Sequence, residues 1–186
     1  MGFWDPELAS DLLAEFVPKE KREEVRIIDF GCGSGIMGKY AKEKHGFKHI
    51  DGVDASEKML EKAAEKNAYE DLKHFYVGCG EMPEKYVGAY DYASSTGSFL
   101  PKHIPCTGIA DIVAAVKKDG FIIISFRDMY LNDPEMGHQV FIDKLIAEGK
   151  IALHKKMTWM KYKEFTDSNV PIYNPGTSHM LIFKKL

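Results

Sequence analysis

A short junction near the start of the chain constrains its fold more than any other stretch. The mostly apolar, β-branched run 25–30 ends in the glycine-rich loop Gly31–Gly35, and a helical pattern follows at once. Glycine adopts backbone conformations that other residues avoid, so such a loop turns tightly and lets a ligand approach its backbone. The junction therefore predicts a strand, a loop and a helix, with a ligand site at the loop.

The rest of the chain alternates predicted strands and helices. Strands are expected at 25–30, 49–53, 72–77, 90–95, 121–126, 152–162 and 180–185, and helices at 6–17, 35–45, 56–67, 108–117 and 134–149. Asp5 and Asp133 are expected to cap the first and last of these helices. The alternation implies an α/β fold, in which a parallel sheet is covered by helices on both faces. No linker divides the 186 residues, so a single domain over 1–186 is expected.

Polar or reactive side chains stand where several predicted strands end. They are Asp29, Asp54, Cys79, Ser95 and Arg127. Ligands of parallel sheets bind at the carboxyl ends of the strands, so these residues are expected to line one edge of the sheet. Strand alternation puts Asp51 on the opposite face from Asp54, and Asp51 is expected to be a surface acid.

Composition and charge exclude some classes of function. The net charge of −3 at pH 7 argues against a nucleic-acid binder with a strongly basic face. Cys32, Cys79 and Cys106 are few and far apart, so neither a disulfide framework nor a metal site is expected. No apolar run reaches membrane length, and a soluble protein of the reducing cytoplasm is expected.

The glycine loop is compatible with more than one ligand. Gly33, Gly35 and Gly38 form a literal GxGxxG pattern, which is typical of NAD and FAD sites. Asp29, however, stands where a pyrophosphate would be repelled, and its carboxylate suits a cationic ligand. S-adenosylmethionine carries an ammonium group and a sulfonium, so a methyl donor is favoured. A nicotinamide-dependent oxidoreductase is the alternative, and a purely structural turn is a third interpretation.

Asp54 ends the second predicted strand at a sensible distance past the glycine loop. An acid at this place can accept hydrogen bonds from both hydroxyls of a ribose. The alternative is a turn or helix-capping aspartate, although Ser56 is itself able to cap the helix that follows.

Several segments, in order along the chain, resemble the motifs of class I S-adenosylmethionine-dependent methyltransferases. They are Ile28–Gly35, Gly52–Leu60, Tyr90–Gly97 and Val116–Phe121. In addition, Trp4–Leu8 and Ile104–Cys106 resemble the methyltransferase-like proteins named after the Williams–Beuren syndrome region. The resemblance implies a Rossmann-like, doubly wound, seven-stranded sheet of order 3-2-1-4-5-7-6 with the last strand antiparallel, and S-adenosylmethionine as the cofactor.

The resemblance also implies which residues bind the donor. Asp29 would orient the ammonium group through the loop or a water, Asp54 would hold the ribose, and Met59 would lie beside the adenine. The full set is Asp29, Gly31, Cys32, Gly33, Gly35, Asp54, Ala55, Met59, Cys79, Gly80, Glu81, Ser95, Thr96 and Gly97. Where the family often has an acid for the adenine amino group, this chain has Cys79, so a backbone carbonyl or Glu81 is expected to take that contact.

The sequence indicates the residues that contact the methyl acceptor less clearly than those that bind the donor. Methyl transfer needs mainly alignment of the two reactants, and a general base only when the acceptor keeps its proton at neutral pH. His103, beyond the fourth strand, is the candidate base, and an exposed loop histidine is the alternative. Candidate acceptor contacts are Trp4, Arg127, Tyr130 and Tyr173. A small molecule methylated on oxygen or nitrogen is expected, and a non-catalytic donor-binding partner subunit is a further alternative.

Overall fold

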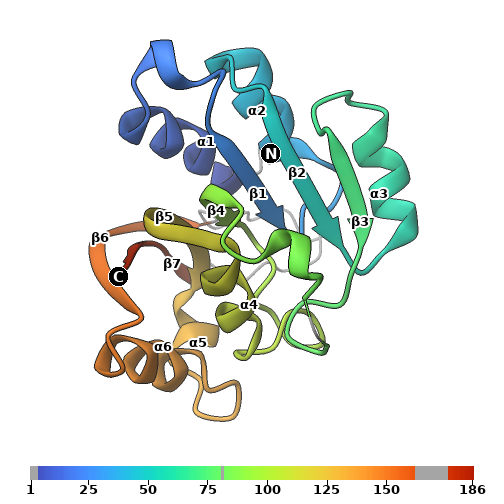
Figure 1. Ribbon diagram of the computed structural model, residues 1–186. Coiled ribbons are helices and arrows are strands. Elements are labelled where there is room, and N and C mark those ends of the chain that lie inside the picture. Colours follow the sequence, from blue (N-terminus) through green and yellow to red (C-terminus); the bar gives the residue numbers. More distant parts are fainter. Residues whose placement is uncertain (1–3, 81, 162–175) are drawn as a thin grey trace.

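The computed structural model describes residues 4–80, 82–161 and 176–186, and among them it contains a seven-stranded sheet (Figure 1). The strands are β1 (Arg26–Phe30), β2 (His49–Asp54), β3 (Asp71–His74), β4 (Tyr90–Ser95), β5 (Val116–Arg127), β6 (Ile151–Lys161) and β7 (Gly176–Lys185). Their order is β3-β2-β1-β4-β5-β7-β6. Neighbours from β3 to β5 pair in parallel, whereas β7 runs antiparallel to both β5 and β6. The strand order and the antiparallel last strand expected from the family resemblance are confirmed.

Helices cover the sheet on both faces, as the alternation predicted. They are α1 (Trp4–Phe16), α2 (Ile36–His45), α3 (Glu57–Ala64), α4 (Gly108–Ala115), α5 (Asp128–Leu131) and α6 (His138–Ala147), with short 3-10 turns η1 (Lys19–Lys21) and η2 (Glu84–Tyr86). None of the described helices is both long enough and apolar enough to span a bilayer.

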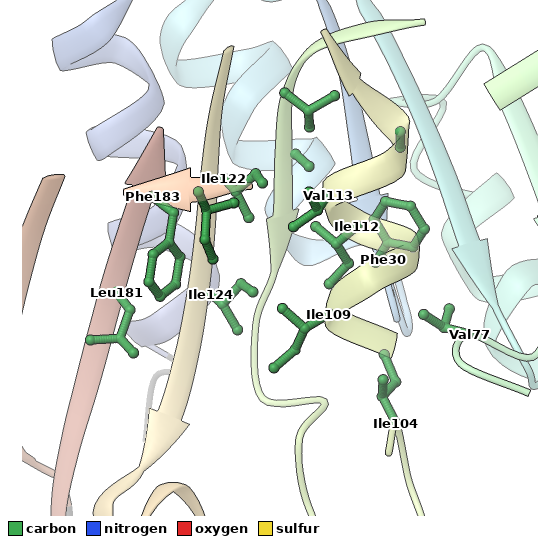
Figure 2. Packing of buried hydrophobic residues seen from close by; sticks show 14 of the residues in the cluster. Phe30, Val77, Ile104, Ile109, Ile112, Val113, Ile122, Ile124, Leu181 and Phe183 are labelled. Atoms are coloured by element: carbon green, nitrogen blue, oxygen red, sulfur yellow. The ribbon is translucent and has the colours of Figure 1, made fainter. Parts of the chain in front are cut away.

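Each face of the sheet has its own apolar core. On one face, Leu12 and Leu13 of α1 pack with Met37 and Ala41 of α2 against the sheet. The core on the other face contains the isoleucines of α4 together with β5 and β7, and Figure 2 shows Ile109 and Ile112 beside these strands. Burial on both faces explains why the strand Phe121–Phe126 is almost wholly apolar rather than alternating. The two cores fix the strand ends, and therefore the site that the strand ends carry.

Some element boundaries differ from those predicted. Helix α1 begins at Trp4, so Asp5 lies within its first turn; Asp5 is buried and accepts a hydrogen bond from the Ser125 hydroxyl at 3.2 Å. The predicted helix 134–149 shortens to α6 because Gly137 adopts a left-handed φ of 67°. Asp133 instead closes a turn before it, where its Oδ1 accepts from the Glu135 amide at 2.9 Å.

Asp51 was expected at the surface, and that prediction is wrong. Its exposure is only 6%, and its Oδ2 accepts hydrogen bonds from the Tyr90 hydroxyl at 2.6 Å and from Arg26 Nη2 at 3.0 Å. Strand β2 lies inside a sheet that is covered on both faces, so pointing away from Asp54 does not mean pointing into solvent. Strand alternation predicts which side of β2 carries Asp51, but it does not predict whether that side is buried.

Candidate functional site

A cavity of about 720 Å³ lies at the carboxyl ends of β1, β2 and β4. Its walls come from the glycine loop after β1, the residues that follow β2 and β3, and the loop after β4. The volume falls in the range of small-molecule sites, roughly 300–1,000 Å³. The residues predicted from the sequence that line it are Gly31, Cys32, Gly33, Asp54, Ala55, Met59, Cys79, Thr96, Gly97 and His103.

Other predicted site residues lie outside the cavity lining. Those with a described position are Asp29, Gly35, Gly80, Ser95, Arg127 and Tyr130. Glu81 and Tyr173 fall outside the described residues, as does the side chain of Trp4, the first residue of α1. The residues predicted at the strand ends therefore fall into two groups. Some line the cavity, and the others lie outside its lining.

The alternating glycines of the loop serve different purposes. Gly31, Gly33 and Gly35 all have left-handed φ values, 66°, 55° and 80°, which strain any residue with a Cβ. A Cβ on Gly31 would lie 2.4 Å from Ser98 Oγ, so this glycine admits a neighbouring loop. A Cβ on Gly33 would meet no atom within 4 Å. Because Gly33 also lines the cavity, it is the loop residue that leaves open space for a ligand.

Asp54 ties the glycine loop to the end of β2. Its Oδ2 accepts from the Gly33 amide at 2.8 Å, and its Oδ1 accepts from the Ser56 amide at 2.9 Å. Ser56 caps α3 with its own hydroxyl, which accepts from the Met59 amide at 3.4 Å. Asp54 is therefore a turn residue and a cavity wall at once. A carboxylate has about four lone-pair positions, so each oxygen can accept a further hydrogen bond from a ligand hydroxyl.

Asp29 lies beneath the loop instead of facing the cavity. It is 1% exposed, and its two oxygens accept hydrogen bonds from the Ser94 and Tyr69 hydroxyls, each at 2.8 Å. Burial raises the pKa of the Asp29 carboxyl to about 7, with a smaller contribution from the Asp54 charge, while the two hydrogen bonds oppose the rise. Any effect of Asp29 on a ligand therefore passes through its neighbours and depends on pH near neutrality.

Two cysteines line the cavity, and they differ in burial. Cys32 is buried in the cavity wall, and burial, followed by the charges of Asp29 and Asp54, raises the pKa of its thiol far above the ordinary value. The thiol therefore stays protonated and is a poor nucleophile. Cys79 is exposed and also lines the cavity. Within residues 4–80, 82–161 and 176–186, no three His, Cys, Asp or Glu side chains are grouped to hold a metal ion.

Two hydrogen bonds hold the start of the loop that follows β4. The Gly97 amide donates to Ser125 Oγ at 2.9 Å, and the Ser98 hydroxyl donates to the Gly31 carbonyl at 3.2 Å. Gly97 has a left-handed φ of 66°, and a Cβ there would also meet nothing within 4 Å. The cavity thus has two open glycines, Gly33 and Gly97, on loops that a hydrogen bond holds together.

His103 lies on the cavity wall next to Lys102. Its ring is exposed, and Nδ1 lies 3.0 Å from the Pro101 carbonyl oxygen. A carbonyl only accepts, so Nδ1 carries the hydrogen of this bond, and Nε2 of the neutral ring keeps a lone pair. The arrangement leaves His103 able to accept a proton at Nε2.

Arg127 is the last residue of β5, and Tyr130 lies in α5, which follows it. The Arg127 guanidinium is 5.6 Å from the centre of the Tyr130 ring, a cation–π distance. Asp128 Oδ1 accepts from His179 Nε2 at 2.8 Å, and His179 Nδ1 lies 2.9 Å from the Thr158 hydroxyl. These contacts join the ends of β5, β6 and β7, and their residues stand apart from the described cavity lining.

Sequence reasoning missed Tyr69, which lies between α3 and β3. Its hydroxyl donates to Asp29 and accepts from the Gly38 amide at 3.1 Å. Its ring fills the space beside two glycines of the GxGxxG pattern: a Cβ on Gly35 or Gly38 would lie 2.9 or 2.4 Å from ring atoms. These glycines therefore make room for a tyrosine rather than a pyrophosphate, which removes the support that the pattern lent to a dinucleotide. No sequence spacing links Tyr69 to residues 31 to 40 positions earlier.

Comparison with known proteins assigns the chain to a family. A family model described as a methyltransferase domain matches residues 3–170. The chain is similar to human methyltransferase-like protein 27, with 28% identity over 122 residues that cover 66% of this chain and 48% of that protein. It is also similar to the ribosomal protein L11 methyltransferase of Clostridium perfringens, with 27% identity over 138 residues that cover 74% of this chain and 41% of that protein. The chain thus spans less than half the length of these curated relatives.

The fold is also found in solved structures. The magnesium protoporphyrin IX methyltransferase from Synechocystis, with S-adenosylmethionine bound, superimposes with a TM-score of 0.65 and 16% identity, covering 97% of this chain and 79% of that one. The family resemblance predicted from the sequence motifs is confirmed. The match over residues 3–170 shows that the chain belongs to the methyltransferase-domain family, with the fold of the class I S-adenosylmethionine-dependent methyltransferases.

Proposed function

We propose that the chain binds S-adenosylmethionine in this cavity and catalyses transfer of its methyl group to an oxygen or nitrogen atom of a small molecule. The observation that carries the proposal is the pairing of Gly33 with Asp54 on one wall: an open, left-handed glycine whose amide is held by a carboxylate. When bound, the donor supplies a methyl group on a cationic sulfur that leaves as a neutral thioether.

The residues present fit such a donor. Gly33 and Gly97 leave open space for its methionine part, and the Asp54 carboxylate has acceptor positions for the ribose hydroxyls. Met59, with Phe75 and Val77, gives the cavity apolar surface suited to the adenine. The Tyr69 ring fills the space beside Gly35 and Gly38, where the pyrophosphate of a dinucleotide would need to approach the loop, so the site disfavours a dinucleotide.

The choice of a small acceptor rests on the cavity itself. The relatives named above act on substrates as different as a ribosomal protein and a porphyrin, so their names do not select an acceptor. Apart from Asp54, the charged or titratable lining is Lys102, His103, Tyr76 and two cysteines. We assign His103 Nε2 as the group that takes the proton of an O–H or N–H acceptor, and Lys102 as a cation that favours an acceptor carrying negative charge.

Calorimetric titration with S-adenosylhomocysteine and, separately, NADH tests the donor. We expect saturable binding of S-adenosylhomocysteine and no binding of NADH, because the Tyr69 ring occupies the space beside Gly35 and Gly38 that a pyrophosphate would need. Binding of NADH without S-adenosylhomocysteine would overturn the proposal. A screen of donor consumption across a metabolite library then identifies the acceptor, and turnover separates an enzyme from a donor-binding partner subunit.

His103→Gln tests the proposed base once an acceptor is in hand. We expect kcat to fall by about 100-fold or more, since a positioned general base contributes roughly 10²–10⁴ in rate. Affinity for S-adenosylhomocysteine should stay within about twofold, because the donor residues are untouched. His49→Gln, at an exposed histidine that pairs with Glu70, is the matched control and should leave kcat unchanged. Equal kcat in wild type and His103→Gln would exclude this role.

A further inference from the structure

The helix that follows the glycine loop has no cap of its own. The first amides of an α-helix find no partner within the helix, and a side chain at the N-cap position normally accepts from one of them. In α2 that position is Gly35, which has no side chain. The amide of Gly38, the third residue of the helix, is instead bound by the Tyr69 hydroxyl at 3.1 Å. Tyr69, which lies 31 residues after Gly38, thus takes the place of the missing N-cap side chain.

The same hydroxyl connects the two ends of the loop. Tyr69 donates to Asp29 Oδ2 at 2.8 Å, and Asp29 immediately precedes Phe30 and the loop, whereas Gly38 follows it. The Gly38 amide only donates, so the Tyr69 oxygen accepts from it, and the hydroxyl hydrogen goes to Asp29 when that carboxyl is ionised. The Ser94 hydroxyl, which donates to Asp29 Oδ1 at 2.8 Å, anchors the carboxylate to β4.

The Tyr69 ring is held in place by glycines. A Cβ on Gly35, Gly38 or Gly52 would lie 2.9, 2.4 or 2.9 Å from ring atoms, so the ring occupies a slot that only glycines on α2 and β2 leave open. Burial, the Asp29 charge and the hydrogen bond to Asp29 raise the pKa of the Tyr69 hydroxyl well above its ordinary value. The hydroxyl therefore remains protonated and able to donate at neutral pH.

We propose that Tyr69 is a positioning residue of the donor site: its hydroxyl replaces the N-cap of α2 and holds the loop Gly31–Gly35 in the shape that receives the donor. We call this hold of the Tyr69 hydroxyl on the loop the clamp. The identity of the ligand rests on the proposed function, whereas the clamp does not. Tyr69 lies outside the described cavity lining, so it acts through the loop and not by contact.

Tyr69→Phe tests the clamp, because the variant keeps the ring in its slot and removes both hydrogen bonds. Tyr90→Phe is the matched control: Tyr90 is also buried, and its hydroxyl donates to the buried Asp51 at 2.6 Å, but from the start of β4. We expect Tyr69→Phe to weaken S-adenosylhomocysteine binding by about tenfold, the effect of losing a helix cap, and Tyr90→Phe by less than about twofold. Equal losses in the two variants, or none in Tyr69→Phe, would overturn the proposal.

Hydrogen exchange distinguishes failure of the clamp from failure of the proposed function. The Gly38 amide should exchange faster in Tyr69→Phe than in wild type without any ligand present, and unchanged in Tyr90→Phe. If wild type does not bind S-adenosylhomocysteine but this exchange difference holds, the donor assignment is wrong and the clamp stands. If Gly38 exchange is the same in Tyr69→Phe and wild type, the clamp is wrong whatever the ligand. Gly38→Ala, which forces a Cβ against the ring, should reproduce the loss of affinity with the hydroxyl intact.

Discussion

Asp54→Ala is expected to weaken S-adenosylhomocysteine binding by roughly a hundredfold or more, because hydrogen bonds to a charged group contribute about 1.5–3 kcal/mol each. The Asp54 carboxylate holds the Gly33 amide at 2.8 Å and the Ser56 amide at 2.9 Å. Its loss frees the open part of the glycine loop and, on the proposed function, removes the acceptor for the ribose. Calorimetric titration of wild type and variant measures the change.

Two further variants separate these contributions. Asp54→Asn keeps the shape and one acceptor oxygen, so it should retain part of the affinity lost in Asp54→Ala. Ser56→Ala removes the cap of α3, whose bond to the Met59 amide is long at 3.4 Å, and should change donor affinity by less than about threefold. If Asp54→Ala folds and binds S-adenosylhomocysteine like wild type, the donor does not use this wall of the cavity.

Asp29→Asn is expected to raise the stability of the ligand-free protein and to lower its affinity for the donor. In wild type a carboxylate is buried with no cation in contact among its described partners, which are the Ser94 and Tyr69 hydroxyls. An amide removes the charge and should stabilise the ligand-free protein by up to about 4 kcal/mol at pH 8, the full value of the pKa difference. The amide offers one acceptor oxygen where the carboxylate offers two, so the Tyr69 and Ser94 hydroxyls compete for it and the clamp on Gly38 loosens.

The sign of the pH dependence follows from the raised pKa. The carboxyl pKa rises from 3.8 to about 7 on folding, so the folded state holds the proton more tightly than the unfolded state. The stability linked to Asp29 is fully present below about pH 4 and is lost as pH rises through about 7. Wild type should therefore lose stability relative to Asp29→Asn across this interval. Denaturant unfolding of both proteins at several pH values measures the difference.

Donor affinity should show the opposite trend. Above pH 7 the ionised carboxylate accepts from both hydroxyls, whereas at pH 6 its protonated form must itself donate. Binding of S-adenosylhomocysteine to wild type should therefore strengthen as pH rises through about 7, and Asp29→Asn should show no such step and bind about tenfold more weakly at pH 8. Asp51→Asn is the control, since Asp51 is also buried but pairs with Arg26; it should destabilise the fold and leave donor affinity unchanged. Wild-type affinity in Asp29→Asn at pH 8 would exclude Asp29 from the donor site.

Strands and helices were predictable wherever the local pattern is strong. The fourth strand was predicted at 90–95 and is found at Tyr90–Ser95, and α2 ends at His45 before the left-handed Gly46, as predicted. The start of the last predicted helix failed because a single residue changed the backbone direction. Gly137, with its left-handed φ, delays α6, and nothing in the apolar period of that segment marks the interruption.

The sequence by itself determined the alternation of strands and helices, the glycine loop and the aspartate at the end of the second strand, because these depend on chain neighbours and on the periods of helices and strands. The sheet order came from the family resemblance rather than from any local pattern. Only the tertiary structure decided that Asp51 is buried, that Gly33 faces open space while Gly35 and Gly38 enclose a ring, and that Tyr69 bridges Asp29 and Gly38. Such partners lie 31 to 40 residues apart, and they meet because β2 pairs with both β1 and β3, an arrangement that no periodicity encodes.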